Sequence, residues 1–337
     1  MYKVPNNENG IIEHFREYAG RLKTAAEEVL SKRSILSTTS YIDTFLRDLV
    51  VCDERNPGTE SLLGKLLIGD FSKQKELIVN ITTELEKSEI KQPGDTKEFL
   101  SVMDNLFVKE FYEDAKAFDK NKHIERVGIE VCPYCGRNYI YSVERPTKSN
   151  PQTRVKPQID HFLPKSKYPY LALNYYNLVP SCPSCNQLPC KWNNNPIGDQ
   201  NDKEYLMHPY EFRDSDIKFS YIPTTSMYNP SSVTIQMACK NADLDKGYKE
   251  WLVLDKLYGK HNSVVSRMYV QLESIISISY GKSIREVFRV KENFLEKLPQ
   301  MLFGYDMDDA QAPYITLHKF NKDIFKQLRL ELESNEN

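Results

Sequence analysis

The sequence has no apolar run long enough to cross a membrane, no internal repeat and no low-complexity tract. A membrane helix needs about 18 consecutive apolar residues. The first ten residues are polar and lack the apolar centre of an export signal. We therefore expect no membrane contact and a cytoplasmic location. A length of 337 residues, 40% hydrophobic and 27% charged, is sufficient for two globular domains or one large one.

The chain contains seven cysteines. An odd number argues against a disulfide framework, as does the expected cytoplasmic location. Four of them form two Cys-x-x-Cys pairs, Cys132 with Cys135 and Cys182 with Cys185, with 46 residues between the pairs. Each pair presents two thiolates to one cation, and two pairs complete the tetrahedron of a structural Zn²⁺. The alternatives are two unrelated buried pairs or a thioredoxin-like redox motif. The redox motif follows a strand in a βαβ unit, and no such pattern is visible.

The charge of the chain is unevenly distributed. Residues 131–200 contain eight Lys or Arg and three Asp or Glu, a net charge of +5, whereas the remainder carries −7. A basic segment in an acidic chain favours a local contact with a polyanion over binding across the whole surface. Taken alone, the charge pattern favours a chance fluctuation on a solvated surface.

Apolar residues at helical spacing dominate both ends of the chain, and Thr96 is a possible cap. Between residues 132 and 196 this pattern gives way to aromatic, proline, asparagine and basic residues, with short strands predicted at 137–143 and 155–160 joined as a hairpin. The sequence thus predicts an α+β, mainly helical protein, with regions 1–125, 126–210 and 211–337. The predicted helices are 11–30, 42–50, 72–87, 96–111, 246–280, 283–298 and 317–332.

Between the two cysteine pairs, Asp160 and His161 are adjacent, and Asn186 directly follows Cys185. A carboxylate can hold a hard divalent cation while a neutral imidazole accepts a proton from water. A second oxygen ligand must come from across the site, and the cysteine clamp fixes the position of Asn186. Phosphodiester hydrolysis needs this division of roles, because a base makes hydroxide while a cation neutralises charge on the phosphate.

The order Asp160-His161, Asn177 sixteen positions later and Asn186 nine further resembles the HNH, or ββα-metal, nuclease motif. The flanking cysteine pairs resemble those of the zinc-clamped HNH subgroup. Within it, residues 132–135, 160–169 and 177–182 are similar to bacterial anti-phage HNH proteins, among them the nuclease subunit of Septu systems and retron-associated nucleases. The similarity is specific over about residues 131–210.

The resemblance implies a small zinc-stabilised ββα-metal module between two helical regions, acting as a DNA endonuclease in anti-phage defence. His161 would be the general base, and Asp160 and Asn186 would hold Mg²⁺ or Mn²⁺. Asn177 would hold the loop and orient His161 through a backbone contact. The helical regions could dock an ATPase or another defence component.

One departure from the family pattern concerns the residues after Asn186. The family usually has Cys-Asn-x-x-Lys, whereas Pro189 stands at the lysine position here and the next lysine is Lys191. We therefore expect a short or shifted helix at Asn186, and whether Lys191 reaches the phosphate stays open. Lys165, Lys167, Arg154 and Lys156 could contact phosphates or be merely solvated.

Each site residue also has a structural interpretation. His161 could be a hydrogen-bonded loop histidine, Asn177 could cap a turn, and Asn186 could cap a helix start. His208 is better explained as a structural histidine before a turn. The aromatic residues of the segment are expected to pack rather than to stack on bases. They are Tyr134, Tyr139, Phe162, Tyr168, Tyr170, Tyr175 and Tyr176.

Two other function classes compete with a nuclease. A catalytically silent zinc module that binds nucleic acid or protein would keep the cysteines but does not need Asp160 beside His161. A zinc hydrolase or deaminase needs an open zinc position and usually a histidine ligand, whereas four cysteines close the site.

Overall fold

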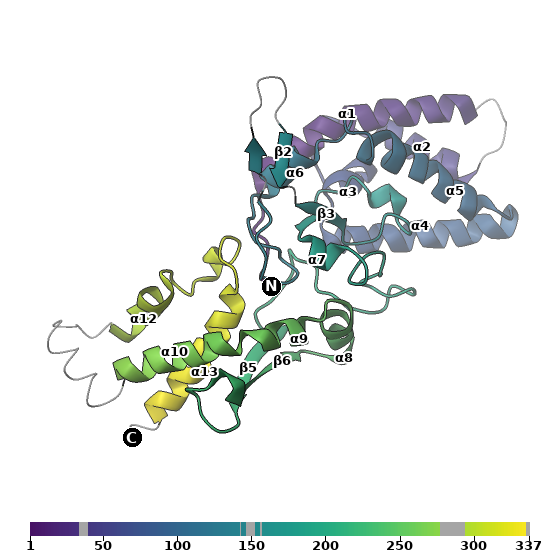
Figure 1. Cartoon of the computed structure of the whole chain (residues 1–337). Helices are drawn as coiled ribbons and strands as arrows, with labels where there is room; N and C mark the ends of the chain where they lie inside the picture. Colours follow the sequence, from purple (N-terminus) through teal and green to yellow (C-terminus); the bar gives the residue numbers. More distant parts are fainter. Residues whose placement is uncertain (34–39, 142, 146–151, 156, 277–293, 335–337) are drawn as a thin grey trace.

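The computed structural model describes residues 1–33, 40–141, 143–145, 152–155, 157–276 and 294–334. N-terminal helices, a small central module and a C-terminal group follow one another in space as well as in sequence (Figure 1). One continuous cluster of buried apolar side chains extends through all three. Among the described residues, no helix combines the length and apolar character that a membrane span requires. The predicted fold class, mainly helical with a small α+β module, is confirmed.

The N-terminal helices form where the apolar spacing predicts them, and side-chain caps fix several starts. Ser40 accepts a hydrogen bond from the amide of Asp43, and Asp70 accepts one from Lys73. The predicted cap Thr96 is wrong. The helix begins after Gly94, whose φ of 99° lies in the left-handed region that glycine tolerates. The elements are α1 (Glu8–Arg33), α2 (Tyr41–Val51), α3 (Leu62–Ile68), α4 (Phe71–Lys91), α5 (Asp95–Met103), the π-helix η2 (Asp104–Tyr112) and α6 (Lys120–Val127).

The central module contains two short antiparallel hairpins in place of the single one predicted. β1 (Val143–Arg145) pairs with β2 (Gln152–Val155), and β3 (Gln158–His161) pairs with β4 (Leu178–Ser181). The predicted strand at 137–143 is wrong in position, since of the described residues there only Val143 belongs to a strand, β1, and Tyr139 forms an isolated bridge with Val131. The one-turn helix α7 (Pro183–Asn186) follows β4, and the 3₁₀ turn η3 (Pro169–Leu171) lies between β3 and β4.

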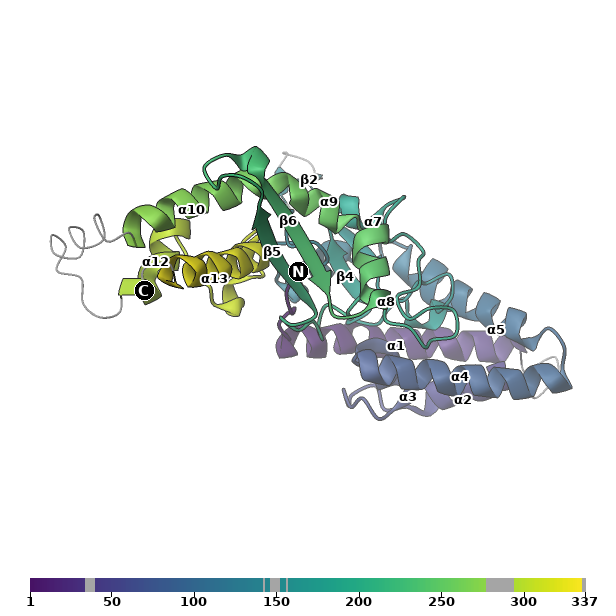
Figure 2. The ribbon, with the colours of Figure 1, turned by 90° about the horizontal axis from the view of Figure 1, so that it is seen from below.

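The C-terminal group consists of the hairpin β5–β6 and the helices packed on it (Figure 2). Side chains of α13 accept hydrogen bonds from the strand β5: Asp323 from the amide of Phe219 and Gln327 from that of Tyr221. This satisfies backbone donors at the edge of the hairpin. The elements are β5 (Ile217–Pro223), η4 (Pro230–Ser232), β6 (Val233–Cys239), α8 (Ala242–Asp245), η5 (Lys246–Trp251), α9 (Leu254–Tyr258), η6 (Gly259–His261), α10 (Asn262–Ile276), α12 (Phe294–Phe303), η7 (Asp309–Gln311) and α13 (His318–Ser334).

Two of the predicted C-terminal helices differ from the structure. The segment 246–276 is broken into η5, α9, η6 and α10, with Val253 in the left-handed region at φ 53° between the first two. The last four residues of that predicted helix, 277–280, lie outside the described residues. Most of the predicted helix 283–298 lies outside the described residues. The helix predicted at 317–332 is α13, shifted by one or two residues.

Candidate active site and metal clamp

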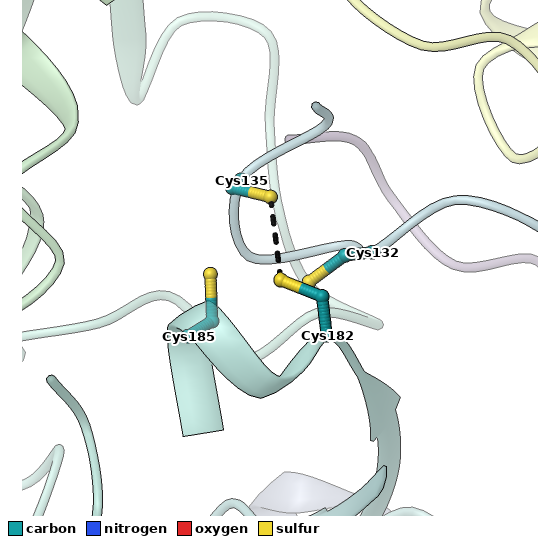
Figure 3. Close-up of side chains that lie close together, drawn as sticks. All are labelled: Cys132, Cys135, Cys182 and Cys185. Carbon is teal, nitrogen blue, oxygen red and sulfur yellow. Dashed lines mark hydrogen bonds between the residues drawn. The ribbon is translucent and has the colours of Figure 1, made fainter. Parts of the chain in front are cut away.

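The four paired cysteines meet at one point between the loop after Val131 and α7 (Figure 3). Their sulfur atoms are buried and all lie within 4.8 Å of one another. The Cys135 and Cys182 Sγ atoms are 3.9 Å apart. Tetrahedral zinc with Zn–S bonds of about 2.3 Å places its sulfurs about 3.8 Å apart, so the cluster fits a four-cysteine zinc site.

Titration of the cysteines also favours a bound cation. Burial raises the pKa of Cys132 well above its ordinary value, and hydrogen bonds among the thiols raise the pKa of Cys185. The pKa of Cys182 is lowered, chiefly because the Cys132 thiol donates to its sulfur. Four buried thiolates cannot form together without a neutralising charge, and a divalent metal ion supplies it.

The loop of the first cysteine pair is held from several sides. The side chain of Asn138 donates to Cys182 Sγ at 3.2 Å, and the Arg137 amide donates to Cys135 Sγ at 3.4 Å. From the C-terminal group, the Tyr258 hydroxyl donates to the Cys135 carbonyl at 2.6 Å, and the Leu317 amide donates to the Gly136 carbonyl at 2.6 Å. The clamp is therefore the point where the C-terminal group joins the module.

A cavity of about 530 Å³ opens at the end of α7. It brings Asp160 and His161, at the end of β3, together with Asn186, at the end of α7. The two ends of the π-helix η2, far away in the sequence, complete its wall. The lining residues are Asp104, Tyr112, Gln158, Ile159, Asp160, His161, Pro164, Lys165, Ser166, Asn186, Gln187, Trp192 and Asn193.

Asp160 is 3% exposed and is held by two partners that the sequence did not indicate. The Tyr134 hydroxyl donates to Asp160 Oδ2 at 2.5 Å. The ammonium of Lys191 lies 3.0 Å from Oδ1 and 2.9 Å from Oδ2, and it also donates to the His161 carbonyl at 2.9 Å. Lys191 is completely buried. Because Asp160 still borders the cavity, its carboxylate has acceptor capacity left for a ligand there.

Burial and pairing act against each other in this ion pair. Burial raises the pKa of Asp160, while the neighbouring Lys191 lowers it in part. Burial likewise lowers the pKa of Lys191, against the attraction of Asp160. Such a pair survives in a protein interior only when further hydrogen bonds complete it. Tyr134 and the His161 carbonyl provide them.

His161 is buried, with its ring edge-on to Tyr112 at a centroid distance of 4.4 Å. Its Nε2 atom lies 3.1 Å from the carbonyl oxygen of Ala172. A carbonyl can only accept, so Nε2 must carry the proton, which leaves Nδ1 as the basic nitrogen. Burial lowers the pKa of His161 to about 3, so the ring is neutral at neutral pH.

Asn177 is fully buried and bonds to the backbone on both sides of the loop between β3 and β4. Its Oδ1 accepts from the Leu163 amide at 2.7 Å, and its Nδ2 donates to the carbonyls of Leu163 and Leu171, both at 3.1 Å. Leu171 precedes Ala172, the hydrogen-bond partner of His161. Asn177 thus fixes the backbone that holds the imidazole, without contacting it through its own side chain.

Asn186 is half-buried at the last position of α7, so it does not cap a helix start. Its Nδ2 donates to Gln158 Oε1 at 3.0 Å, which leaves the amide oxygen as the atom suited to a cation. The predicted short helix is confirmed, since α7 ends at this residue and Pro189 lies beyond it. Asp160 and Asn186 are oxygen donors on one cavity and fit a hard divalent cation.

The remaining predicted residues divide between the cavity and the core. Lys165 borders the cavity and pairs with Glu113, while Lys167 donates to the carbonyl of Asp199 at 2.9 Å. The side chain of Arg154 and the whole of Lys156 lie outside the described residues. The predicted aromatic packing holds for six residues, whereas Tyr139 is 51% exposed. The six buried ones are Tyr134, Phe162, Tyr168, Tyr170, Tyr175 and Tyr176.

His208 does not border the cavity. It is buried and stacks on Phe71 at a centroid distance of 4.6 Å, with Phe162 edge-on at the same distance. Burial lowers the pKa of His208 to about 3, as it does for His161. Packing between α4 and the module is consistent with the structural role expected for it.

Comparison with known proteins assigns the central module. Residues 132–188 match the model of the HNH endonuclease family. This segment is an HNH endonuclease domain. It contains all four clamp cysteines, Asp160, His161, Asn177 and Asn186, and it ends before Lys191 and Trp192. Neither the curated proteins nor the solved structures contain a match to this chain.

Proposed function

We propose that this protein is a metal-dependent endonuclease that hydrolyses phosphodiester bonds in DNA. The observation that carries the proposal is the meeting of Asp160, His161 and Asn186 at one cavity of an HNH domain. Phosphodiester hydrolysis requires a base and a cation site side by side. His161 supplies the base, because its Nε2–H donates to a carbonyl and its Nδ1 is free of a proton. Asp160 and Asn186 supply the oxygen ligands beside it.

Each residue has a separate part in the proposed reaction. Nδ1 of His161 accepts the proton of the attacking water, while the Ala172 carbonyl holds Nε2 in place. Asp160 and Asn186 would hold Mg²⁺ or Mn²⁺, which when bound neutralises charge on the phosphate and the leaving oxygen. Asn177 positions the loop that carries Ala172. We propose zinc in the clamp, in a structural role.

We also propose a division of the chain into 1–125, 126–210 and 211–337, with the first two regions working as one scaffold. Hydrogen bonds from the N-terminal helices support this view. His14 Nε2 lies 2.7 Å from the Leu173 carbonyl, and His123 Nε2 lies 2.8 Å from the Leu178 carbonyl. Gln74 donates to Asn174 at 2.8 Å. The contacts of His14 and Gln74 hold the loop between β3 and β4, and that of His123 holds the first residue of β4.

The biological setting that we propose is anti-phage defence, in which the nuclease acts with an ATPase or another partner. Its support is the similarity of residues 132–135, 160–169 and 177–182 to the Septu and retron-associated nucleases. Co-expression of candidate partner genes from the same genomic locus, with phage plating as the measurement, tests this setting separately from the chemistry.

The chemistry is tested by replacing His161 with Ala and measuring nicking of supercoiled plasmid with Mg²⁺ or Mn²⁺. Loss of the general base lowers the cleavage rate by about 10²- to 10⁴-fold. His208→Phe is the matched control, because it replaces a second buried histidine that does not border the cavity, and it should cleave at the wild-type rate. Unchanged cleavage by His161→Ala contradicts the proposal, and so does absence of cleavage by the wild type with every candidate partner present.

Zinc content of the same proteins tests the remaining alternative. We expect one zinc per chain in the wild type and in His161→Ala. A zinc ion lost together with His161 would point to a catalytic zinc, as in a hydrolase or deaminase.

A further inference from the structure

Trp192 combines three unusual properties at the rim of the cavity. It is one of only two tryptophans in the chain, and it is 51% exposed. It borders the same cavity as His161 and Asn186. Its φ of 42° lies in the left-handed region, which a bulky side chain rarely adopts. Strain of this kind persists only where the surrounding structure imposes it, and it is concentrated at functional sites.

The surrounding structure imposes it through Lys191 and α7. The side chain of Lys191 points inward to Asp160, whereas that of Trp192 is half exposed. The Lys191 amide donates to the Cys185 carbonyl at 3.1 Å, and the Trp192 amide donates to the Asn186 carbonyl at 3.2 Å. The indole is therefore attached to a rigid base between the clamp and the cavity, with its side chain half in solvent.

We propose that Trp192 is a stacking platform for an unpaired nucleobase next to the phosphate that is cleaved. This inference rests on the proposed nuclease function and names its substrate class. Aromatic faces bind every base in a single strand, with little sequence preference, whereas the faces of paired bases are covered by their neighbours. The substrate is then single-stranded or locally unpaired nucleic acid.

One cationic side chain near Trp192 suits this substrate. Lys165 borders the same cavity, which Asp104 and Asp160 also line. The segment 131–200, which contains Lys165 and Trp192, carries a net charge of +5. A groove that attracts the backbone, combined with an aromatic face for the bases, is the usual arrangement in proteins that bind single strands. The indole and the lysine would thus act on different parts of one strand.

The test measures binding of two strands of equal length and charge, oligo(dT) and an abasic oligomer, by fluorescence polarisation. All variants carry His161→Ala so that no strand is cleaved. Trp192→Ala should weaken binding of oligo(dT) about tenfold and leave the abasic strand unaffected. Trp192→Phe should stay within about threefold of the parent protein, since it keeps an aromatic face. Leu188→Ala is the matched control, because Leu188 is 68% exposed on the same loop but does not border the cavity.

Trp192→Gly separates a binding role from a structural one. Glycine adopts a positive φ without strain, so this variant should melt at a higher temperature than the parent protein while binding oligo(dT) as weakly as Trp192→Ala. A lower melting temperature for both Ala and Gly variants, with binding unchanged, would show that the indole serves packing alone and overturn the inference.

Other outcomes also overturn it. They are equal weakening on both strands, no weakening on either, weakening that Leu188→Ala reproduces, and failure of the parent protein to bind oligo(dT). Plasmid cleavage by the protein with an intact His161 is measured in parallel. Cleavage with no effect of Trp192→Ala on binding refutes the platform alone, whereas base-dependent binding without cleavage under any condition refutes the nuclease alone.

Discussion

The clamp and the cavity adjoin the same short helix, yet they differ in the source of the positive charge that balances their acidic groups. Cys185 of α7 belongs to the clamp, and the next residue, Asn186, borders the cavity. The clamp consists of four buried thiols that need a metal ion before they can ionise together. The cavity already contains a buried cation of the chain itself, because Lys191 pairs with Asp160.

Because of this difference, we expect the folding of the module to depend on the clamp and its chemistry to depend on the cavity. A cluster without its own counter-charge makes folding depend on a metal ion. A carboxylate paired with lysine can be folded and positioned without one, and a ligand of the cavity then meets a preformed site. The C-terminal group is attached to the clamp through Tyr258, while His123 of the N-terminal helices holds β4, the partner strand of β3.

The largest expected effect follows from removing the metal of the clamp. Structural zinc sites contribute about 10–16 kcal/mol in small zinc modules. Cys185→Ser, or chelation of the wild type, should therefore abolish cooperative unfolding of the module, together with zinc binding and cleavage. Circular dichroism, limited proteolysis and metal analysis measure this.

The control for the clamp is Cys239→Ser, a partly exposed cysteine at the end of β6 outside the cluster. It should keep one zinc per chain and its melting temperature. A Cys185→Ser protein that stays folded and protease-resistant without zinc would show that the clamp, like the cavity, folds without a metal ion. That result contradicts the proposed difference between the two sites.

The second effect concerns the internal cation of the cavity. Lys191→Met leaves the carboxylate of Asp160 buried without its charge partner, which lowers the free energy of unfolding by about 3–5 kcal/mol. The double variant Asp160→Asn, Lys191→Met removes both charges and should recover more than half of that loss. Urea unfolding of the four proteins of this cycle measures the coupling. Zinc content should stay at one per chain throughout, since neither residue belongs to the clamp.

If the changes in the free energy of unfolding caused by the two substitutions simply add, Lys191 does not act through Asp160. Loss of zinc in Lys191→Met would show that metal binding by the clamp depends on the ion pair of the cavity, which contradicts the expected independence of the two sites. Cleavage by the double variant should remain low even where stability is recovered, because Asp160 is a proposed ligand of the catalytic metal.

The clamp could be predicted from the sequence because its geometry is largely local. Two residues between paired cysteines fix the approach of both sulfurs within a single turn, so only the meeting of the pairs depends on the fold. The adjacency of Asp160 and His161 is likewise local, and the HNH domain expected from it is confirmed over residues 132–188. Their catalytic roles stay predictions.

Residues that depend on distant packing could not be predicted. Tyr112 reaches His161 from η2, and the partner of Asp160 is 31 positions away, at Lys191. The displaced lysine after Asn186 marked this position as unusual, but spacing alone does not show whether a lysine points inward or outward. The strand β4 was missed because Pro180 interrupts its pattern, and its pairing with β3 buries all four residues.

A third, smaller effect concerns the loss of folding stability in acid. Burial lowers the pKa of His14 to about 3 and that of His123 to about 4. His14 holds the loop between β3 and β4 at Leu173, and His123 holds the start of β4 at Leu178. A histidine whose folded pKa is depressed stabilises the fold fully above its unfolded pKa of about 6.5, and this stability is lost as the pH falls toward the folded value. Each of the two histidines should therefore cost about 2 kcal/mol of stability between pH 7 and pH 5.

His123→Gln tests this by keeping a donor toward the Leu178 carbonyl without a titrating ring. The variant should lose about 2 kcal/mol less than the wild type between pH 7 and pH 5, as measured by urea unfolding. The thiolates of the clamp titrate in both proteins alike, so the difference isolates the helical scaffold. Parallel stability curves for the two proteins would show that His123 does not contribute to the acid sensitivity.

The smallest effect on stability is expected at the cavity rim, where Lys165 pairs with Glu113 in a partly exposed ion pair. Because such pairs contribute at most about 1 kcal/mol, Lys165→Ala should unfold almost as the wild type does. Its effect on binding is different, since one fewer phosphate contact lowers the slope of log affinity against log salt concentration by about one. Lys167→Ala is the matched control, because Lys167 donates to the Asp199 carbonyl and does not border the cavity. Equal salt slopes for the wild type and Lys165→Ala would show that Lys165 does not contact a phosphate. Trp192 would then be the one proposed substrate contact at the rim of the cavity.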